Sequence, residues 1–420
     1  MLHNIQPDDH GPLGSRMASA VSTCVHCGFC LAACPTYQEL GQEADSPRGR
    51  IILMKEVLEG TLATDTALKH IDPCLGCLAC EPACPSGVAY RDLISPFRSI
   101  TESQRQRTLS EKFWRKLVQL TLPYPGRFRL AAFAGRFVKP VARWLPKTLR
   151  VMLELLPSTM PQKQSWPEIS PAIGPRRARV ALLTGCSQSV LDPDINTATI
   201  DVLTRNGVEV VVPQSQACCG ALSWHVGNIS QAQAFASQNL SAFPEDVDAI
   251  LTNAAGCGSA LDEYDLILKG TKDEQRAINF REKVCDISEF LEELGDLQPI
   301  HDSGRKLRVA YHDACHLANA QGVRSQPRNL LRRIPGIELC EIADGHLCCG
   351  SAGTYNIDQP EVANSLGEQK VSHVLATNPQ VVVSGNIGCL IQLRTHLAKK
   401  NSPVGVYHTM QVLRDAYHES

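Results

Sequence analysis

The stretch CVHCGFCLAACP, residues 24–35, holds four cysteines, and CLGCLACEPACP, residues 74–85, repeats their arrangement. Both copies read C-x2-C-x2-C-x3-C-P, which is the spacing of bacterial-type iron–sulfur ligation. Disulfides are typical of small secreted domains, and structural zinc sites usually pair two separated C-x2-C elements. The doubled motif therefore predicts two [4Fe–4S] clusters, with zinc as the alternative metal.

In bacterial-type ligation the fourth cysteine of each run reaches the neighbouring cluster, because the chain turns away at the proline. This crossed pattern predicts that the ligands of the first cluster are Cys24, Cys27, Cys30 and Cys84. It predicts that the second cluster takes Cys74, Cys77, Cys80 and Cys34. Clusters that exchange ligands lie close together, so that single electrons can pass between them.

Other residues near the two runs carry weaker signals. Ser46 and Pro47 predict the start of a helix. Arg48 and Arg50, in its first turn, lie either beside an anionic cluster or in solvent. We expect His26, inside the first run, to be a loop residue, because four ligands are already assigned there.

Length and composition favour a large protein of a reducing compartment. The 420 residues, 43% of them hydrophobic, suffice for two or three domains with cores of their own. The polar N-terminal residues lack the basic start and apolar stretch of a secretory signal. The sequence contains no run of 18 apolar residues, so no membrane span is predicted. We expect the 18 cysteines to lie in the cytoplasm and to serve metal or redox chemistry.

Residues 111–154 carry ten Lys or Arg against two acids, interleaved with aromatic residues and cut by prolines. Basic, aromatic, amphipathic segments of this kind lie on anionic membrane surfaces, dock on acidic partners or bridge two domains. The sequence leaves these three roles open. A nucleic-acid partner is not expected, because no nucleic-acid-binding module accompanies the basic residues.

After a linker rich in proline and glycine, residues 165–177, the chain contains an internal repeat. RVALLTGC (179–186) matches RVAYHDAC (308–315), VEVVVPQSQACCG (208–220) matches IELCEIADGHLCCG (337–350), and AILTNAAGC (249–257) matches VVVSGNIGC (381–389). The matched cysteines are 129, 130 and 132 residues apart. An offset this constant predicts a duplicated domain of about 130 residues.

The repeated cysteines follow short apolar, β-branched runs that predict buried parallel strands. Because the carboxyl ends of parallel strands meet at one sheet edge, each repeat should gather four thiols there. The first set is Cys186, Cys218, Cys219 and Cys257, and the second is Cys315, Cys348, Cys349 and Cys389. We expect both sets to bind metal, as an additional iron–sulfur cluster or as zinc, with a redox-active dithiol as the alternative.

Several residues near these loops have no assigned role. His225, His312 and His346 are expected to contact the metal ligands, to carry protons, or to be ordinary polar loop residues. Cys285 and Cys340 have no counterpart in the other repeat, so we expect core thiols.

These patterns predict an α+β multidomain fold. A mainly helical, two-cluster ferredoxin-like domain is expected at 1–105 and a basic, aromatic helical linker at 106–177. Two duplicated α/β domains, which we call CCG domains after their Cys-Cys-Gly sequence, are expected at 178–300 and 301–420.

Two cluster motifs followed by two CCG repeats resemble the iron–sulfur subunits of membrane-linked dehydrogenases and heterodisulfide-reductase-like proteins. The strings CVHCGFCLAACPTYQELG (24–41), SPRGRI (46–51), CEPACPSGVAY (80–90) and HLCCGSAGTYN (346–356) are most similar to the iron–sulfur subunits of glycolate oxidase (glycolate dehydrogenase). The resemblance covers residues 20–415. Heterodisulfide-reductase-type repeats end in C-x2-C, whereas Ala254 and Asn386 stand at the earlier position here, so the unusual cluster of those relatives is not carried over.

The resemblance implies an electron-transfer subunit of a flavin-dependent 2-hydroxy-acid dehydrogenase. Glycolate would be oxidised to glyoxylate on a partner subunit that carries FAD, and electrons would pass through the clusters towards a quinone. The chain has no strand–GxGxxG–helix fingerprint and no phosphate loop, so we assign it no catalytic residue and no flavin.

The implied location is the cytoplasm. The alternative is a peripheral position on the cytoplasmic face of the inner membrane, with contact through residues 111–154. Two other functions stay open. One is the equivalent subunit of a lactate-utilising or anaerobic glycerol-3-phosphate dehydrogenase complex, and the other is a non-enzymatic cluster or zinc protein.

Overall fold

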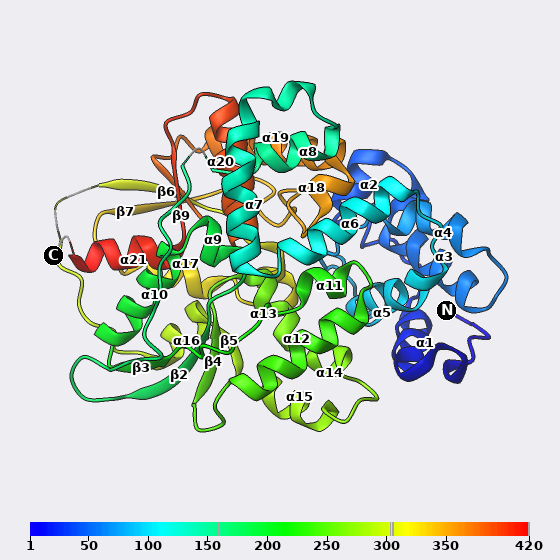
Figure 1. Ribbon diagram of the computed structural model, residues 1–420, viewed down its shortest axis with the longest axis horizontal. Helices are drawn as coiled ribbons and strands as arrows, with labels where there is room; N and C mark the ends of the chain where they lie inside the picture. The colour runs from blue at the N-terminus through cyan, green and yellow to red at the C-terminus, as the bar shows by residue number, and fades with distance from the viewer. Residues whose placement is uncertain (158, 303, 305, 419–420) are drawn as a thin grey trace.

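The computed structural model describes residues 1–157, 159–302, 304 and 306–418. The N-terminal helices gather at one end of the molecule and the strands of two sheets lie towards the other (Figure 1). The α+β multidomain architecture predicted from the sequence is confirmed.

Short helices build the N-terminal part and leave both cysteine runs in the loops between them. The elements are η1 (Pro7–Leu13), α1 (Gly14–Thr23), α2 (Pro35–Leu40), η2 (Glu43–Asp45), α3 (Pro47–Leu58), α4 (Thr64–Ile71), α5 (Arg91–Thr101) and η3 (Glu102–Gln104). Helix α3 begins where the sequence predicts, because Ser46 Oγ accepts a hydrogen bond from Gly49 N at 3.0 Å. The first run follows α1 and the second follows α4.

The basic segment folds into four pieces that are separated or started by prolines. They are α6 (Leu109–Thr121), α7 (Pro125–Val138), η4 (Lys139–Trp144) and α8 (Lys147–Glu154). Several large apolar side chains of these helices stay exposed, and together with the neighbouring Lys and Arg residues we call them the basic–apolar surface. Its apolar members are Leu109, Phe113, Leu117, Leu120, Leu130, Phe133, Phe137, Val138, Val141 and Trp144.

The first repeat contains a five-stranded sheet of order β1-β3-β2-β4-β5. Its parallel strands are β2 (Ala178–Leu183), β3 (Val208–Val211), β4 (Ala249–Thr252) and β5 (Val284–Asp286). Strand β1 (Ile169–Ser170) lies inside the segment that we expected to be only a linker, and it pairs antiparallel with β3. It covers backbone groups that would otherwise be unpaired at a sheet edge.

The second repeat contains a four-stranded parallel sheet of order β7-β6-β8-β9. Its strands are β6 (Leu307–Tyr311), β7 (Ile337–Glu341), β8 (Val381–Val383) and β9 (Gly405–Tyr407). The order matches β3-β2-β4-β5 of the first repeat strand for strand. The duplication predicted from the cysteine offsets is therefore confirmed in the topology, while the exact domain bounds stay a prediction.

Helices pack on the sheets and complete the two repeats. In the first repeat they are α9 (Gln188–Leu191), α10 (Asp194–Arg205), α11 (Ala221–His225), α12 (Ile229–Ala242), α13 (Ala255–Asp262), α14 (Tyr264–Ile267), α15 (Glu274–Arg281) and α16 (Ile287–Leu294). In the second they are η5 (His316–Ala320), α17 (Ser325–Arg332), α18 (Tyr355–Asp358), α19 (Pro360–Ala376), α20 (Ile387–Lys399) and α21 (Thr409–His418). Across the described ranges, no helix combines the length and apolarity needed to cross a bilayer.

One buried arginine joins the N-terminal part to the first repeat. The Arg98 guanidinium donates hydrogen bonds to the carbonyl oxygens of Ile71 at 3.0 Å, Cys74 at 2.7 Å and His225 at 3.1 Å. Gly227 packs on the backbone of Arg98 from the other side, and a Cβ there would lie 2.4 Å from the Arg98 oxygen.

We expect Gly227→Ala to loosen this contact between the parts. Gly227 has φ +83° and Gly174 has φ +81°, but a Cβ at Gly174 meets nothing within 4 Å. Both substitutions carry the backbone cost of about 1–2 kcal/mol, and Gly227→Ala should lose about 1–3 kcal/mol more through the clash. Urea unfolding of both variants measures the difference, and equal losses would contradict this packing.

Candidate metal centres

The first group of thiols lines a pocket in the N-terminal part. Its lining includes all four cysteines that the crossed pattern assigns to one cluster, namely Cys24, Cys27, Cys30 and Cys84, and Cys80 reaches it as well. Burial raises the pKa of Cys30 to about 11, and the thiols of Cys24 and Cys84 contribute. Because five thiols converge on this one pocket, the donor set fits a metal cluster.

The second group of thiols is buried throughout. It contains Cys34 from the first run and Cys74, Cys77 and Cys80 from the second. Burial raises the pKa of Cys80, and the charges of Cys77, Cys74 and Cys34 add to the shift. The thiol of Cys34 therefore lies among the cysteines of the second run, and four sulfur donors are available to one cluster.

Arg50 supplies a positive charge to this second group. Its side chain is 1% exposed, and Nη1 donates to Thr36 Oγ1 at 2.9 Å and lies 3.9 Å from Cys34 Sγ. Burial alone would raise the pKa of Cys74, but Arg50 and Arg98 lower it. Of the two alternatives that the sequence left open, proximity to the cysteines is the right one for Arg50.

Arg48 and His26 lie at the first pocket instead. Arg48 pairs with Glu43 at 2.7 Å and donates to the backbone oxygen of His26 at 3.0 Å. Burial lowers the pKa of His26, and the nearby positive charges of the N-terminus and Arg48 lower it further. His26 is thus a loop residue at the rim, with a φ of 59°.

In the first repeat, the four predicted cysteines meet beyond the carboxyl ends of β2, β3 and β4. The Sγ atoms of Cys186 and Cys218 are 3.4 Å apart. Hydrogen bonds from the thiols of Cys218 and Cys257 lower the pKa of Cys219, so one thiolate is favoured in the group.

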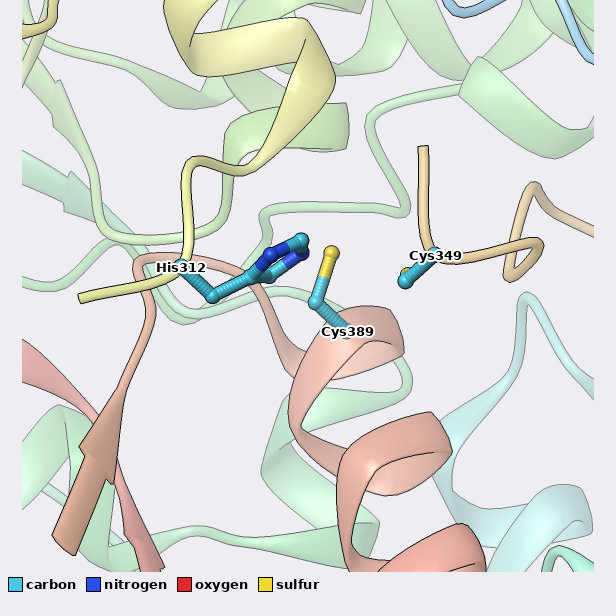
Figure 2. Close-up of side chains that lie close together, drawn as sticks. All are labelled: His312, Cys349 and Cys389. Carbon is cyan, nitrogen blue, oxygen red and sulfur yellow. The ribbon is translucent and has the colours of Figure 1, made fainter. Parts of the chain in front are cut away.

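In the second repeat the same arrangement recurs with one addition. The Sγ atoms of Cys315 and Cys348 are 3.8 Å apart. Cys349 and Cys389 also lie close to the imidazole of His312, and one ligand atom of each of these three residues lies within 4.8 Å of the others (Figure 2). The remaining residues behave as ordinary ones: His346 is exposed, and Cys285 and Cys340 are half-buried on strands β5 and β7.

The second repeat contacts the second cysteine run directly. His316 Nε2 hydrogen-bonds to the oxygen of Gly76 at 2.9 Å, and Asn319 Nδ2 donates to the oxygen of Cys77 at 3.1 Å. Cys77 and Cys315 lie in one packed cluster. The thiols of the second repeat are therefore neighbours of the buried N-terminal group.

A cleft of about 420 Å³ opens where the N-terminal part, helix α6 and both repeats meet. Trp114 and Tyr355 line it together with Cys74. The imidazoles of His225 and His316, which also line it, stack at 5.4 Å between ring centroids, and burial lowers the pKa of His225 to about 3. An aromatic, partly charged cleft of this size beside a predicted cluster ligand is large enough for a small molecule.

Sequence reasoning left open one residue of the second repeat and missed the cleft. His312 was one of three loop histidines without an assigned role. The repeat alignment could have singled it out, because it stands 129 residues after Leu183, the same offset as Cys315 from Cys186, and so replaces an apolar residue of the first repeat. The cleft has no sequence signal, because its walls come from four segments that only the packing of the domains brings together.

Two family models match the chain. A "4Fe-4S dicluster domain" matches residues 20–88, and a "Cysteine-rich domain" with the short name CCG matches residues 180–262 and 309–394. One solved structure, a hypothetical protein from Helicobacter pylori, is similar with a TM-score of 0.51 and 10% sequence identity. The match covers 98% of this chain and 73% of that chain, and at this identity it shows similarity of the fold alone.

Several curated relatives are also similar in sequence. The "Probable glycolate oxidase iron-sulfur subunit" of Bacillus subtilis is 38% identical over 413 residues, covering 94% of this chain and 93% of the relative. The "Glycolate oxidase iron-sulfur subunit" of Escherichia coli is 36% identical over 405 residues, covering 95% of this chain and 94% of the relative. "Lactate utilization protein A" of Oceanobacillus iheyensis is 32% identical over 238 residues, covering 56% of this chain and 96% of the relative. With both cluster motifs and both CCG repeats present, the chain belongs to the family of glycolate oxidase iron–sulfur subunits.

Proposed function

We propose that the chain carries electrons from a flavin subunit, where glycolate is oxidised to glyoxylate, towards a quinone. The observation that carries the proposal is that the thiols of the two N-terminal runs intermix: Cys84 lines the pocket of the first run, and Cys34 lies near the cysteines of the second. This arrangement supports two metal sites that lie close together. When bound, [4Fe–4S] clusters accept and release single electrons. Relatives named for glycolate oxidase span 94–95% of the chain, which supports glycolate as the substrate of the complex.

We assign the cysteines as the crossed pattern has it. The first cluster takes Cys24, Cys27, Cys30 and Cys84, which line one pocket. The second takes Cys74, Cys77, Cys80 and Cys34, which are all buried. The eight CCG cysteines are assigned to metal binding as well, supported by the short Sγ–Sγ distances in each repeat.

The protein's own residues prepare the second site for negative charge. Arg50 and Arg98 offset the charge of Cys74, and Leu75 and Leu78 are buried beside it and exclude water. A nearby positive charge stabilises the reduced, more negative form of a cluster, so these residues favour electron uptake there.

The electron acceptor is proposed to bind in the cleft beside Cys74. Trp114 and Tyr355 offer flat surfaces for a quinone ring. His225 Nε2, which finds no hydrogen-bond partner among the described residues, offers a ring nitrogen for an oxygen atom of the quinone. A quinone takes up two electrons and two protons to become a quinol, so a hydrogen-bonding imidazole in the cleft suits the oxygen atoms that gain the protons.

The basic–apolar surface is proposed to rest on an anionic membrane, which would bring the cleft close to a lipid-soluble acceptor. Helix α6 joins the two features, since Trp114, Arg115 and Val118 line the cleft while Phe113 and Leu117 stay exposed. Exposed aromatic rings among Lys and Arg side chains are suited to the headgroup region of a bilayer.

Lactate is the second candidate substrate of the complex. Relatives named lactate utilization protein A match over 238 residues, 56% of this chain, and at 32% identity in one case. The same chain would then serve a different flavin partner.

In the anaerobic complex with its flavin subunits, glycolate should bleach the visible iron–sulfur absorbance, and L-lactate should not. Added quinone should restore the absorbance. Reduction by L-lactate but not by glycolate would mean that the complex oxidises lactate instead. Reduction by dithionite but by neither acid would contradict the proposed link to a flavin subunit.

Paired cysteine substitutions distinguish crossed from uncrossed ligation. If the ligands cross, Cys24→Ser with Cys84→Ser removes two ligands of one cluster, and iron should fall from about eight to about four per chain. Cys24→Ser with Cys34→Ser should then remove both clusters. Cys285→Ser is the matched control and should keep all the iron. The opposite pattern between the two double variants would mean that each run holds its own cluster.

Binding to vesicles tests the basic–apolar surface. The Phe133→Ser, Phe137→Ser variant should bind phosphatidylglycerol vesicles at least about tenfold more weakly, because each ring contributes about 1.5–3 kcal/mol when it leaves water. Ile173→Ser, at an exposed apolar residue outside this surface, should bind like the unchanged chain. Equal binding by all three chains would contradict a membrane role.

A further inference from the structure

A buried tyrosine connects the two N-terminal groups of thiols. Tyr90 is 3% exposed and lines the pocket of the first group. Its hydroxyl oxygen reaches the second group, where it lies 3.7 Å from Cys74 Sγ, within the range of a hydrogen bond to sulfur. Tyr90 therefore lies between the two candidate cluster sites, with its polar atom at the second one.

The start of helix α5 fixes the position of this side chain. Tyr90 directly precedes α5, and its carbonyl oxygen accepts hydrogen bonds from Leu93 N at 3.1 Å and from Ile94 N at 3.0 Å. The side chains of Leu93 and Ile94 are buried in the same hydrophobic cluster as Tyr90. The ring is thus held by packing, and its hydroxyl group keeps its place beside Cys74.

The direction of the hydrogen bond follows from the chemistry of the two groups. Among the described residues, Cys74 Sγ is the one hydrogen-bond partner of the Tyr90 hydroxyl group. A metal-bound cysteine is a thiolate, which has no proton to donate. A phenol has an ordinary pKa of about 10 and keeps its proton at neutral pH. With the cluster bound, the hydroxyl group therefore donates and the sulfur accepts.

A second hydroxyl group near the same thiols already has other partners. Thr36 Oγ1 lies 3.2 Å from Cys34 Sγ, but it donates to the backbone oxygen of Asp45 at 3.1 Å and accepts from Arg50 Nη1 at 2.9 Å. The Thr36 proton is therefore used by a carbonyl oxygen. Tyr90 provides the hydroxyl proton that is free for a sulfur of this group.

The first group of thiols receives no such bond. In the part of the chain that the structure describes, no side chain donates a hydrogen bond to the sulfur atoms of this group, which belong to Cys24, Cys27, Cys30 and Cys84. The sulfur of Cys84 accepts from the backbone amide of Val88 at 3.5 Å. A side-chain hydroxyl group therefore distinguishes the second candidate cluster site from the first.

We propose that Tyr90 is a positioning residue of electron transfer, whose hydroxyl group raises the reduction potential of the second cluster by donating to Cys74 Sγ. A reduced cluster carries one more negative charge than an oxidised one, and hydrogen bonds strengthen with the charge of the acceptor. Hydrogen bonds to the sulfur atoms are among the features that set cluster potentials. The hydroxyl group therefore stabilises the reduced cluster more than the oxidised one.

The hydrogen bond favours the electron at the cluster nearest the cleft, because Cys74 also lines the cleft in which the acceptor is proposed to bind. Electrons that enter at the first cluster are thereby drawn towards the acceptor. This inference rests on the two proposed clusters and their ligands. It does not rest on glycolate as the substrate or on a quinone as the acceptor.

A redox titration of the anaerobic complex, followed by electron paramagnetic resonance, tests the role of the hydroxyl group. Tyr90→Phe keeps the ring and removes this group. At a fixed potential, it should lower the ratio of reduced to oxidised second cluster about fivefold, which corresponds to about 41 mV for one electron, and leave the first cluster unchanged. The Cys24→Ser, Cys84→Ser background, which should retain the second cluster alone, identifies the step that moves.

Tyr355→Phe is the matched control. The Tyr355 hydroxyl group also lies near Cys74, but it donates to the backbone oxygen of Pro73 at 2.9 Å. Its removal should leave both cluster potentials unchanged. 3-Fluorotyrosine at position 90, introduced by stop-codon suppression, tests the sign: its phenol is the stronger donor and should raise the ratio that Tyr90→Phe lowers.

Unchanged potentials in Tyr90→Phe, equal shifts in Tyr90→Phe and Tyr355→Phe, or a lower ratio with 3-fluorotyrosine would overturn the role. Iron is measured in every sample, and loss of iron in Tyr90→Phe would show a structural role instead. The titration uses dithionite and mediators, so it works even where glycolate fails to reduce the clusters. The proposed function and the role of Tyr90 therefore fail separately.

Discussion

The charge of buried thiolates is the constraint on which the N-terminal part depends. Metal binding makes its cysteines anionic, and most of them are buried. Arg50 and Arg98 provide the compensating charge from inside the core, and both lower the pKa of Cys74. Arg50 also has a buried anionic partner in Asp45, at 3.6 Å, so the carboxylate and the thiolates share its positive charge.

The same arginines connect the site to the rest of the fold. Arg98 donates to backbone oxygens at the start of the second cysteine run, those of Ile71 and Cys74, and reaches the first repeat at His225. Arg50 donates to Thr36 in helix α2, which directly follows the first run. The domains are thus arranged around the second thiol group, which lies beside the cleft and beside the thiols of the second repeat.

The two repeats share the same strand order and the same four thiols, but the side chains beside those thiols differ. Leu183 packs in the core of the first repeat, whereas His312 faces thiols in the second. The sheet thus preserves the positions of its strand ends while single side chains beside them change.

The architecture could be predicted from local patterns, because cysteine spacing and apolar runs depend on nearby residues. The strand runs, the start of α3 at Ser46 and the four-thiol edges all follow from such signals. Strand β1 could not be predicted, since a two-residue strand exists only through its pairing with β3. The burial of Arg50 but not of Arg48 likewise depends on tertiary packing, and so does the cleft.

Electron paramagnetic resonance with iron quantification, on anaerobic chain reduced by dithionite, tests the central claim most directly. Two adjacent clusters predict about eight iron per chain and a spectrum broadened by interaction between two spins. About four iron with a single, uncoupled signal, or zinc in place of iron at the N-terminal cysteines, would contradict the account.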